Sequence, residues 1–264
     1  MSKLGRRQAI TFINYLKFNL SMRRILFALT LLVSFPDAVF AQNSNDKSFR
    51  EEIVIPEIDT FFRRISFDDV EGVKKSLNNK DLSPNTLSKY GDAPLPYAVK
   101  EDAYKVFKYL TQVTDININF ENKSTENALM MLAFKGKLDL VKYLVEDLGA
   151  EPDKDGWAPL HYAATSGHLD IVEYLISKEV DIDAQSPSNT TPLMMAARYG
   201  HIKVVKYLLD NQADLSLHNT QNLTAIDFAY LYNQKEIGDG LRSRWKKLYG
   251  EDYVLKPRLL SSQQ

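Results

Sequence analysis

Apolar residues in the second half of the chain recur at helical spacing. They form two similar runs, IVEYLI at residues 171–176 and VVKYLL at residues 204–209. In the second run, the valines and leucines fall on one face of a helix. A shorter segment of small and apolar residues precedes each run, and a glycine separates the segment from the run. The pattern therefore predicts pairs of helices, each joined by a tight turn.

This pattern returns with a period near 33 residues. The block WAPLHYAATSGH at 157–168 is matched by TTPLMMAARYGH at 190–201, and a tyrosine of the second helix recurs at Tyr109, Tyr143, Tyr174 and Tyr207. A period of this length is typical of stacked repeats, in which no unit can bury its apolar face alone. We expect an all-α solenoid of about six helix-turn-helix units, at residues 59–86, 87–120, 121–152, 153–185, 186–218 and 219–249.

The residues of one unit account for its local structure. Thr191 is suited to cap a helix that starts at Pro192, and Gly200 is suited to end it. In other units Ala158 and Ala93 replace the threonine, at a cost of about 1 kcal/mol per helix start. The third unit keeps Asn127 as a cap and is shorter than the others, so we expect an irregular outer loop over residues 146–152.

These blocks resemble the ankyrin repeat, most specifically in the fourth and fifth units. The resemblance implies a concave surface, formed by the turn tips and the exposed faces of the first helices, to which protein partners bind. It also implies that His161 makes hydrogen bonds that brace adjacent turns, and that His168 and His201 have structural roles.

The N-terminal region carries a separate signal. Two arginines precede a mostly apolar core of 11 residues at 25–35, then a proline and the small residues of a cleavage site after Ala41. This order predicts a secretory signal peptide at 1–41, with translation starting at Met22 and residues 1–21 an upstream extension. The alternative is an uncleaved anchor, although a membrane span needs about 20 apolar residues. We expect residues 42–58 to form a linker, residues 59–249 the ankyrin-repeat domain, and residues 250–264 a C-terminal tail.

The composition agrees with export. The chain has no cysteine, so it has no disulfide and no thiol at risk in an oxidising compartment. The chain contains 33 Lys and Arg and 34 Asp and Glu. Residues 1–41 hold six of the basic residues and one of the acidic residues, so cleavage leaves 27 basic and 33 acidic residues and a net charge of −6. General nucleic-acid binding draws on clustered positive charge, which this balance disfavours. We expect a periplasmic or secreted monomer that is free of the membrane after signal cleavage.

Candidate residues for chemistry are sparse. Four histidines are spread over separate elements and show no metal-ligand spacing. The sequence has no Gly-x-Ser-x-Gly motif, no phosphate-binding glycine loop and no cysteine nucleophile. We therefore expect no catalytic site, no metal and no cofactor.

The concave surface offers candidate protein-binding residues. Aromatic residues and arginine are enriched at binding hot spots. On this basis the candidates are Tyr90, Phe134, Lys135, Trp157, Thr165, Arg198 and Tyr199, within a wider surface that includes Leu231 and Tyr232. The alternative is that Trp157 or Phe134 packs against the adjoining repeat.

The main functional hypothesis is a non-enzymatic protein–protein interaction module, exported to the periplasm and bound to an unidentified protein. One alternative is a secreted effector that mimics host ankyrin adaptors. Another is a membrane-anchored protector of a stress or redox enzyme, which requires an uncleaved N-terminus.

Overall fold

The computed structural model describes residues 57–78 and 82–255, which belong to one compact unit. The described residues form helices and turns and contain no strand. The expected all-α fold class is therefore confirmed. The signal peptide expected at 1–41, most of the linker and the end of the tail lie outside the described residues.

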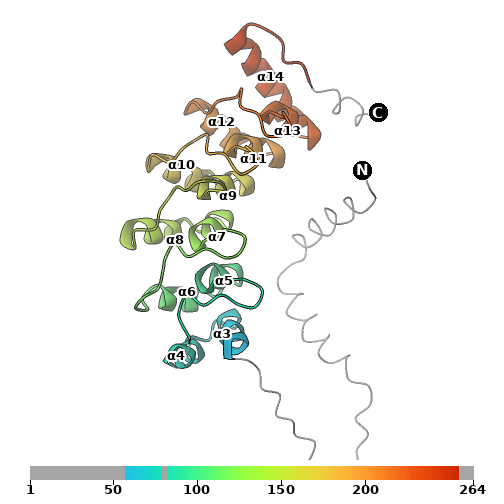
Figure 1. Cartoon of the computed structure of the whole chain (residues 1–264). Coiled ribbons are helices and arrows are strands. Elements are labelled where there is room, and N and C mark those ends of the chain that lie inside the picture. Colours follow the sequence, from blue (N-terminus) through green and yellow to red (C-terminus); the bar gives the residue numbers. More distant parts are fainter. Residues whose placement is uncertain (1–56, 79–81, 256–264) are drawn as a thin grey trace, which may run out of the picture. The chain divides into compact units, whose positions relative to one another are not determined.

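The helices form six consecutive pairs (Figure 1). The first helix of each pair lies on the inner side, and these helices are α3 (Glu57–Ser66), α5 (Pro94–Lys100), α7 (Ala128–Phe134), α9 (Pro159–Ser166), α11 (Pro192–Tyr199) and α13 (Ala225–Leu231). The second helices are α4 (Val70–Asn78), α6 (Tyr104–Leu110), α8 (Leu138–Lys142), α10 (Leu169–Ser177), α12 (Ile202–Asp210) and α14 (Lys235–Tyr249).

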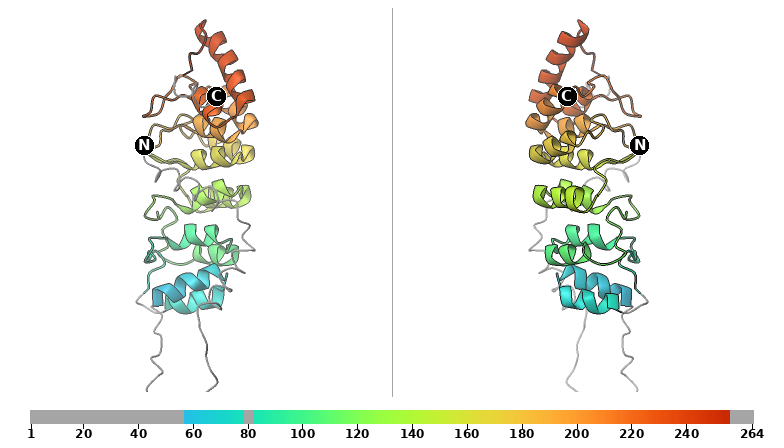
Figure 2. Two further views of the ribbon diagram at one scale, coloured as in Figure 1. Left: turned by 90° about the vertical axis from the view of Figure 1, so that its right-hand side faces the viewer. Right: turned by 90° about the vertical axis from the view of Figure 1, so that its left-hand side faces the viewer.

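The pairs stack in the order of the chain, as the colour sequence in Figure 2 shows. Each inner helix from α3 to α13 contacts the next inner helix, and α4 contacts α6 while α10 contacts both α8 and α12. One hydrophobic core runs through all the pairs, from Phe61 in α3 to Leu241 in α14. The stack therefore buries the apolar faces that no single pair could bury alone.

The helix ends follow the chemistry of their residues. Thr191 Oγ1 accepts a hydrogen bond from the backbone N–H of Met194 at 3.3 Å, and Asn127 Oδ1 accepts one from Met130 at 3.0 Å. Ala93 and Ala158 provide no side-chain cap, as expected. The inner helices α9 and α11 end at glycines with positive φ, where a residue without Cβ is favoured.

The third pair differs from the sequence expectation. A π-helical segment, η1 (Tyr143–Asp147), continues directly from α8, so Glu146 and Asp147 belong to a helix rather than to a loop. The backbone N–H of Ala150 then bonds to the carbonyl of Leu144 at 2.8 Å and closes the segment.

Both ends of the stack also depart from the expected boundaries. Helix α3 begins at Glu57, inside the segment expected as a linker. At the other end, Tyr253 of the expected tail is buried and its hydroxyl donates a hydrogen bond to Asp227. Residues 250–255 are therefore packed on the last pair and do not form a free tail.

Candidate functional site

The turn tips between the pairs are held rigid by side-chain oxygens. Ser186 Oγ accepts hydrogen bonds from the backbone N–H groups of Ser188 and Thr190, at 3.3 and 3.0 Å. Asn219 Oδ1 likewise accepts from Gln221 and Leu223, at 3.0 and 2.9 Å. The two tips are joined by a backbone hydrogen bond of 2.9 Å from Thr220 to Ser188. Together they form a fixed wall beside the inner helices.

Inner helices α11 and α13 face this wall with apolar and aromatic side chains. The guanidinium carbon of Arg198 lies 4.1 Å from the ring centroid of Tyr232 and 5.2 Å from that of Tyr199. Tyr232 in turn stacks on Phe228, with ring centroids 6.2 Å apart and ring planes within 10° of parallel. A cation held over an aromatic face is attracted by the ring quadrupole, so Arg198 is fixed in place.

The wall and the two helices enclose an open groove of about 260 Å³, which we call the α11–α13 groove. The tips contribute Trp157, Ser188, Thr190, Asn219, Thr220, Gln221 and Leu223. The helices and the turn after α13 contribute Met195, Arg198, Phe228, Leu231 and Tyr232. Apart from Arg198 the floor is apolar or aromatic, and apart from Trp157 and Leu223 the wall is polar, a mixture of apolar surface and a few polar groups that is typical of recognition sites.

Arg198 is the only charged residue that lines the α11–α13 groove. Its Nε is buried and has no hydrogen-bond partner, and the whole side chain forms no ion pair with the described residues. Two other concave-face cations are neutralised within the stack: Lys135 pairs with Asp102 at 2.8 Å, and Lys154 pairs with Glu121. The groove therefore carries a positive charge that the described residues leave uncompensated.

The structure brings together three of the residues that the sequence indicated. Trp157 and Arg198 both line the groove, and Tyr199 lies beside Arg198. Trp157 also makes an edge contact with His161 of its own repeat, at 5.2 Å between ring centroids. Met195 and Phe228 were not among the candidates. Their only sequence signal is bulk on an inner helix, which is equally typical of core residues.

The other four candidates lie elsewhere on the stack. Phe134 makes an edge contact with Tyr162 of the next repeat, at 6.3 Å, which agrees with the alternative packing role. Lys135 is engaged with Asp102, and the Thr165 hydroxyl donates to the carbonyl of His161 at 2.7 Å. Tyr90 is 79% exposed at the tip of the second repeat.

The histidines of the repeat motif make structural hydrogen bonds. The backbone N–H of Ala158 donates to His161 Nδ1 at 3.1 Å, so Nε2 carries the proton and donates to the carbonyl of Thr190 at 2.9 Å. This braces the tip of the fifth repeat, as the resemblance implied. Burial lowers the pKa of His161 and keeps the ring neutral. His201 Nε2 similarly donates to the carbonyl of Thr165 at 2.9 Å.

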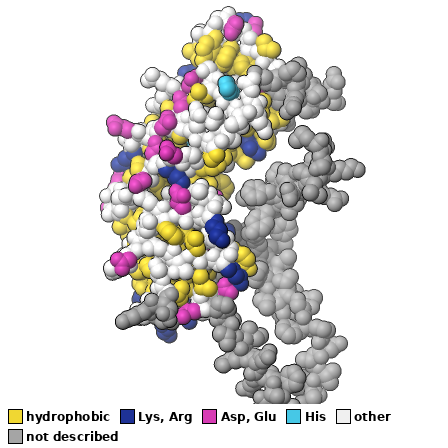
Figure 3. Space-filling model, in the orientation of Figure 1, with side chains coloured by type: hydrophobic (Ala, Val, Ile, Leu, Met, Phe, Trp, Pro, Cys, Tyr) yellow, Lys and Arg dark blue, Asp and Glu magenta, His cyan; other side chains and the backbone are white. Residues whose placement is uncertain are grey.

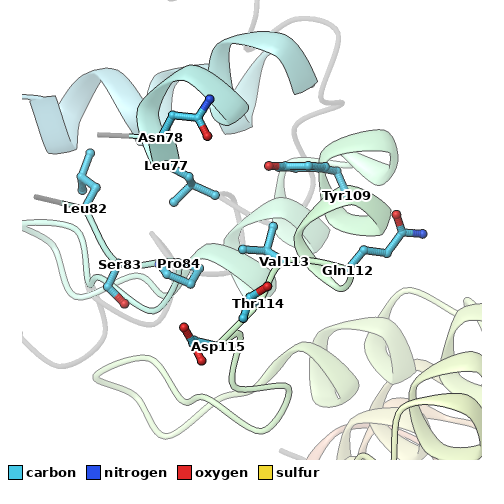
Figure 4. Close-up of a pocket in the computed structure, with 10 residues that line it drawn as sticks. All are labelled: Leu77, Asn78, Leu82, Ser83, Pro84, Tyr109, Gln112, Val113, Thr114 and Asp115. Carbon is cyan, nitrogen blue, oxygen red and sulfur yellow. The ribbon is translucent and has the colours of Figure 1, made fainter. Parts of the chain in front are cut away.

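A larger cavity of about 570 Å³ lies at the ends of α4 and α6 (Figure 4). Its lining includes Leu77, Pro84, Tyr109 and Asp115. Two of its lining residues, Asn78 and Leu82, flank in the sequence the segment 79–81, which lies outside the described residues. We therefore place the candidate site in the α11–α13 groove.

The described residues form neither a membrane span nor a metal cluster. Among the described helices, none has both the length and the hydropathy needed to cross a membrane. Within the same part of the chain, no three His, Asp or Glu side chains gather in a way that could hold a metal ion.

Comparison with known proteins gives two family matches. Residues 97–186 match the family described as Ankyrin repeats (3 copies), and residues 178–229 match Ankyrin repeats (many copies). The two matches overlap and together cover the chain from residue 97 to residue 229.

Individual relatives match shorter segments. The Homo sapiens Notch-regulated ankyrin repeat-containing protein is 43% identical over 67 residues, which are 24% of this chain and 58% of the relative. The Danio rerio Ankyrin repeat and SAM domain-containing protein 6 is 32% identical over 116 residues, 43% of this chain and 16% of the relative. The chain thus covers less than two thirds of each relative.

The period of the sequence, the stacked helix pairs and the two family matches agree with one another. Ankyrin repeats are protein–protein interaction modules, and catalysis is not typical of them. The chain belongs to the ankyrin-repeat family.

Proposed function

We propose that this chain binds a partner protein through the α11–α13 groove and acts without catalysing a reaction. The observation that carries the proposal is the exposure of apolar side chains on the groove floor. Leu231 is 43% exposed and Tyr232 is 40% exposed, although both belong to the last inner helix or the turn after it. When a partner covers apolar surface of this kind, its removal from water stabilises the complex.

Two further features support binding at this place. The tips are fixed by hydrogen bonds from Ser186 and Asn219, so the groove loses little conformational entropy when a partner binds. Acidic and basic side chains are interspersed on the face seen in Figure 3, and this mixture favours a protein partner over a nucleic-acid backbone.

The test is capture of the partner with two matched variants. Leu231→Asp places a charge on the groove floor, whereas Leu248→Asp places the same charge at an exposed position of α14, where Leu248 is 58% exposed. Extracts of the producing cells are passed over the wild type and both variants, and bound proteins are identified by mass spectrometry.

We expect one or more proteins to bind the wild type and Leu248→Asp and to be lost from Leu231→Asp. Both variants are exposed substitutions, so their melting temperatures should stay close to that of the wild type. A partner that binds all three proteins equally would place the interface elsewhere on the stack.

We also propose that the protein acts in the periplasm or after secretion, as a monomer. The support is the signal-peptide pattern at residues 1–41, which lies outside the described residues. The N-terminal residue of the purified protein tests cleavage, and Gln42 is expected. An intact sequence from Met1 or Met22 would instead support the membrane-anchored protector. Protein in the medium or in host cytosol, rather than in the osmotic-shock fraction, would support the secreted effector.

A further inference from the structure

We propose that the partner presents an acidic peptide segment to the α11–α13 groove, with a carboxylate bound to Arg198 and a neighbouring apolar side chain bound to the groove floor. This inference rests on the proposed function of the groove and adds the chemistry of its partner.

The charge of the groove favours an anionic partner. Arg198 is its only charged lining residue, and no acidic side chain pairs with it in the described part of the stack. Lys89, by contrast, has Asp59 at 2.9 Å, and Lys100 has Asp92 at 3.4 Å. The repeats thus neutralise these lysines internally and leave the guanidinium of Arg198 for an external anion.

The geometry of Arg198 favours a carboxylate as that anion. Tyr232 holds the guanidinium at 4.1 Å from its ring centroid, and Nε points into the protein. The two terminal nitrogens also have no acceptor in the described residues, but they are not buried. They form a planar fork with a fixed orientation, which matches the two oxygens of a carboxylate. Little side-chain entropy remains to be lost when the carboxylate binds.

The rest of the groove fits a peptide. Leu231 offers exposed apolar surface in the groove that Arg198 lines, and the nearly buried side chains of Met195 and Phe228 complete the lining. On the facing wall, the side chains of Thr220 and Gln221 are exposed and form no hydrogen bond within the described part of the chain. They can therefore bond to the main chain of a bound segment. A volume of about 260 Å³ is below the range of about 300–1,000 Å³ for small-molecule sites, and it suits one or two side chains of a protein.

A peptide selection tests the inference directly. A library of random octapeptides displayed on phage is selected against the purified chain, and the enriched peptides are synthesised with a fluorescent label. We expect enrichment of Asp or Glu next to Leu, Ile, Met or Phe. Binding constants are then measured by fluorescence anisotropy for the wild type, Arg198→Gln and Lys203→Gln. Lys203 is exposed on the outer helix α12, so its variant removes the same charge away from the groove.

Arg198→Gln should weaken binding about tenfold or more, because a charge-assisted hydrogen bond is lost, whereas Lys203→Gln should change it less than about twofold. Replacing the acidic residue of the peptide by its amide should cause a similar loss in the wild type and little further loss in Arg198→Gln. This coupling would identify the two groups as direct partners. Thermal unfolding of Arg198→Gln checks that the variant is folded.

Several outcomes would overturn the inference: no enriched peptide, enriched peptides without an acidic residue, or equal binding by Arg198→Gln. Displacement of the peptide by a 20-base oligothymidine would point to a nucleic-acid ligand instead. The capture experiment distinguishes failure of this inference from failure of the proposed function. If Leu231→Asp abolishes capture of the partner while Arg198→Gln leaves capture unchanged, the groove is the interface but its partner is not acidic. If neither variant affects capture, the groove itself is wrongly assigned.

Discussion

Small side chains set how closely the repeats approach one another. Ala196 on α11 is fully buried, and α11 contacts α9 on one side and α13 on the other. Ala163 occupies the equivalent position of α9 and is also fully buried. Packed interiors leave few voids, so these positions have no room for a longer side chain without displacement of the neighbouring helices.

Ala196→Leu should therefore overpack the stack and lower the free energy of unfolding by about 1–3 kcal/mol or more. The control is Lys203→Leu on the exposed face of α12, which should change it by less than about 0.5 kcal/mol. Chemical denaturation of both variants measures the difference. A harmless Ala196→Leu would mean that the helices are packed less closely than described.

His161 predicts a pH dependence of stability. Burial lowers its pKa in the folded state, whereas the unfolded chain has the ordinary pKa of about 6.5. Below about pH 6.5 the unfolded state binds a proton that the folded state does not, so the free energy of unfolding falls as the pH falls. The stabilisation is fully present above that pH.

The measurement compares the wild type with His161→Gln between pH 7.5 and pH 5. The variant lacks this titration, so the stability advantage of the wild type should shrink by at most about 1.4 kcal/mol per pH unit below 6.5. An advantage that stays constant over this range would show that the histidine does not titrate differently in the two states.

At the scale of the elements, the end of each inner helix is matched to the next repeat. Gly167 ends α9 with a φ of 76°, and a Cβ at this position would lie 2.3 Å from Nδ1 of His201. Gly136 and His168 repeat the arrangement one unit earlier. At the last junction, Gln234 replaces the histidine and lies against Gly200. The Gly-His pair is thus a contact between neighbouring repeats and also a helix end.

Gly167→Ala should destabilise the protein by about 1 kcal/mol or more, because it places a Cβ both at positive φ and against His201. Gly240→Ala is the matched control. Gly240 lies inside α14 with open space around the position of a Cβ, so the same substitution should stabilise by about 0.5–1 kcal/mol. In thermal unfolding, Gly167→Ala is expected to lower the melting temperature and Gly240→Ala to raise it. Changes in the same direction would contradict the described helix end.

At the scale of the whole molecule, the C-terminal segment closes the exposed end of the stack. The Tyr253 hydroxyl contacts Asp227 and lies 2.8 Å from Thr224 Oγ1, and all three residues are buried. The Tyr253 ring also makes an edge contact with Trp245, at 4.9 Å between centroids. Burial, together with the hydrogen bond to Asp227, raises the pKa of Tyr253, so the hydroxyl keeps its proton and donates a hydrogen bond to the carboxylate.

Tyr253→Phe should lower the free energy of unfolding by about 1–3 kcal/mol, because the buried carboxylate of Asp227 loses a donor. Tyr249→Phe is the control, since Tyr249 is exposed and its ring contact with Trp245 does not need the hydroxyl. Chemical denaturation that gives equal stabilities for the two variants would mean that residues 250–255 do not cap the stack.

The sequence by itself determined the fold class and the register of the helices. These depend on local chemistry that the fifth repeat carries in full and the other repeats carry in part: the cap at Thr191, the break at Gly200 and the apolar spacing of α12. The role of His161 followed from its place in the repeat motif. Because these signals return with the period, a helix whose own signals are weak can be placed from the units on either side of it.

Only the tertiary structure decided where the candidate groove and the end cap lie. The stacking of Arg198 on Tyr232 and the bond from Tyr253 to Asp227 each join residues of different helices or segments. Their side chains meet because the repeats pack at a particular distance and angle, and no periodic pattern encodes that for residues that differ between units. The sequence likewise could not show that the charge of Arg198 is uncompensated. That depends on whether the folded stack places an acidic side chain within ion-pair distance of Arg198, and none of the described residues pairs with it.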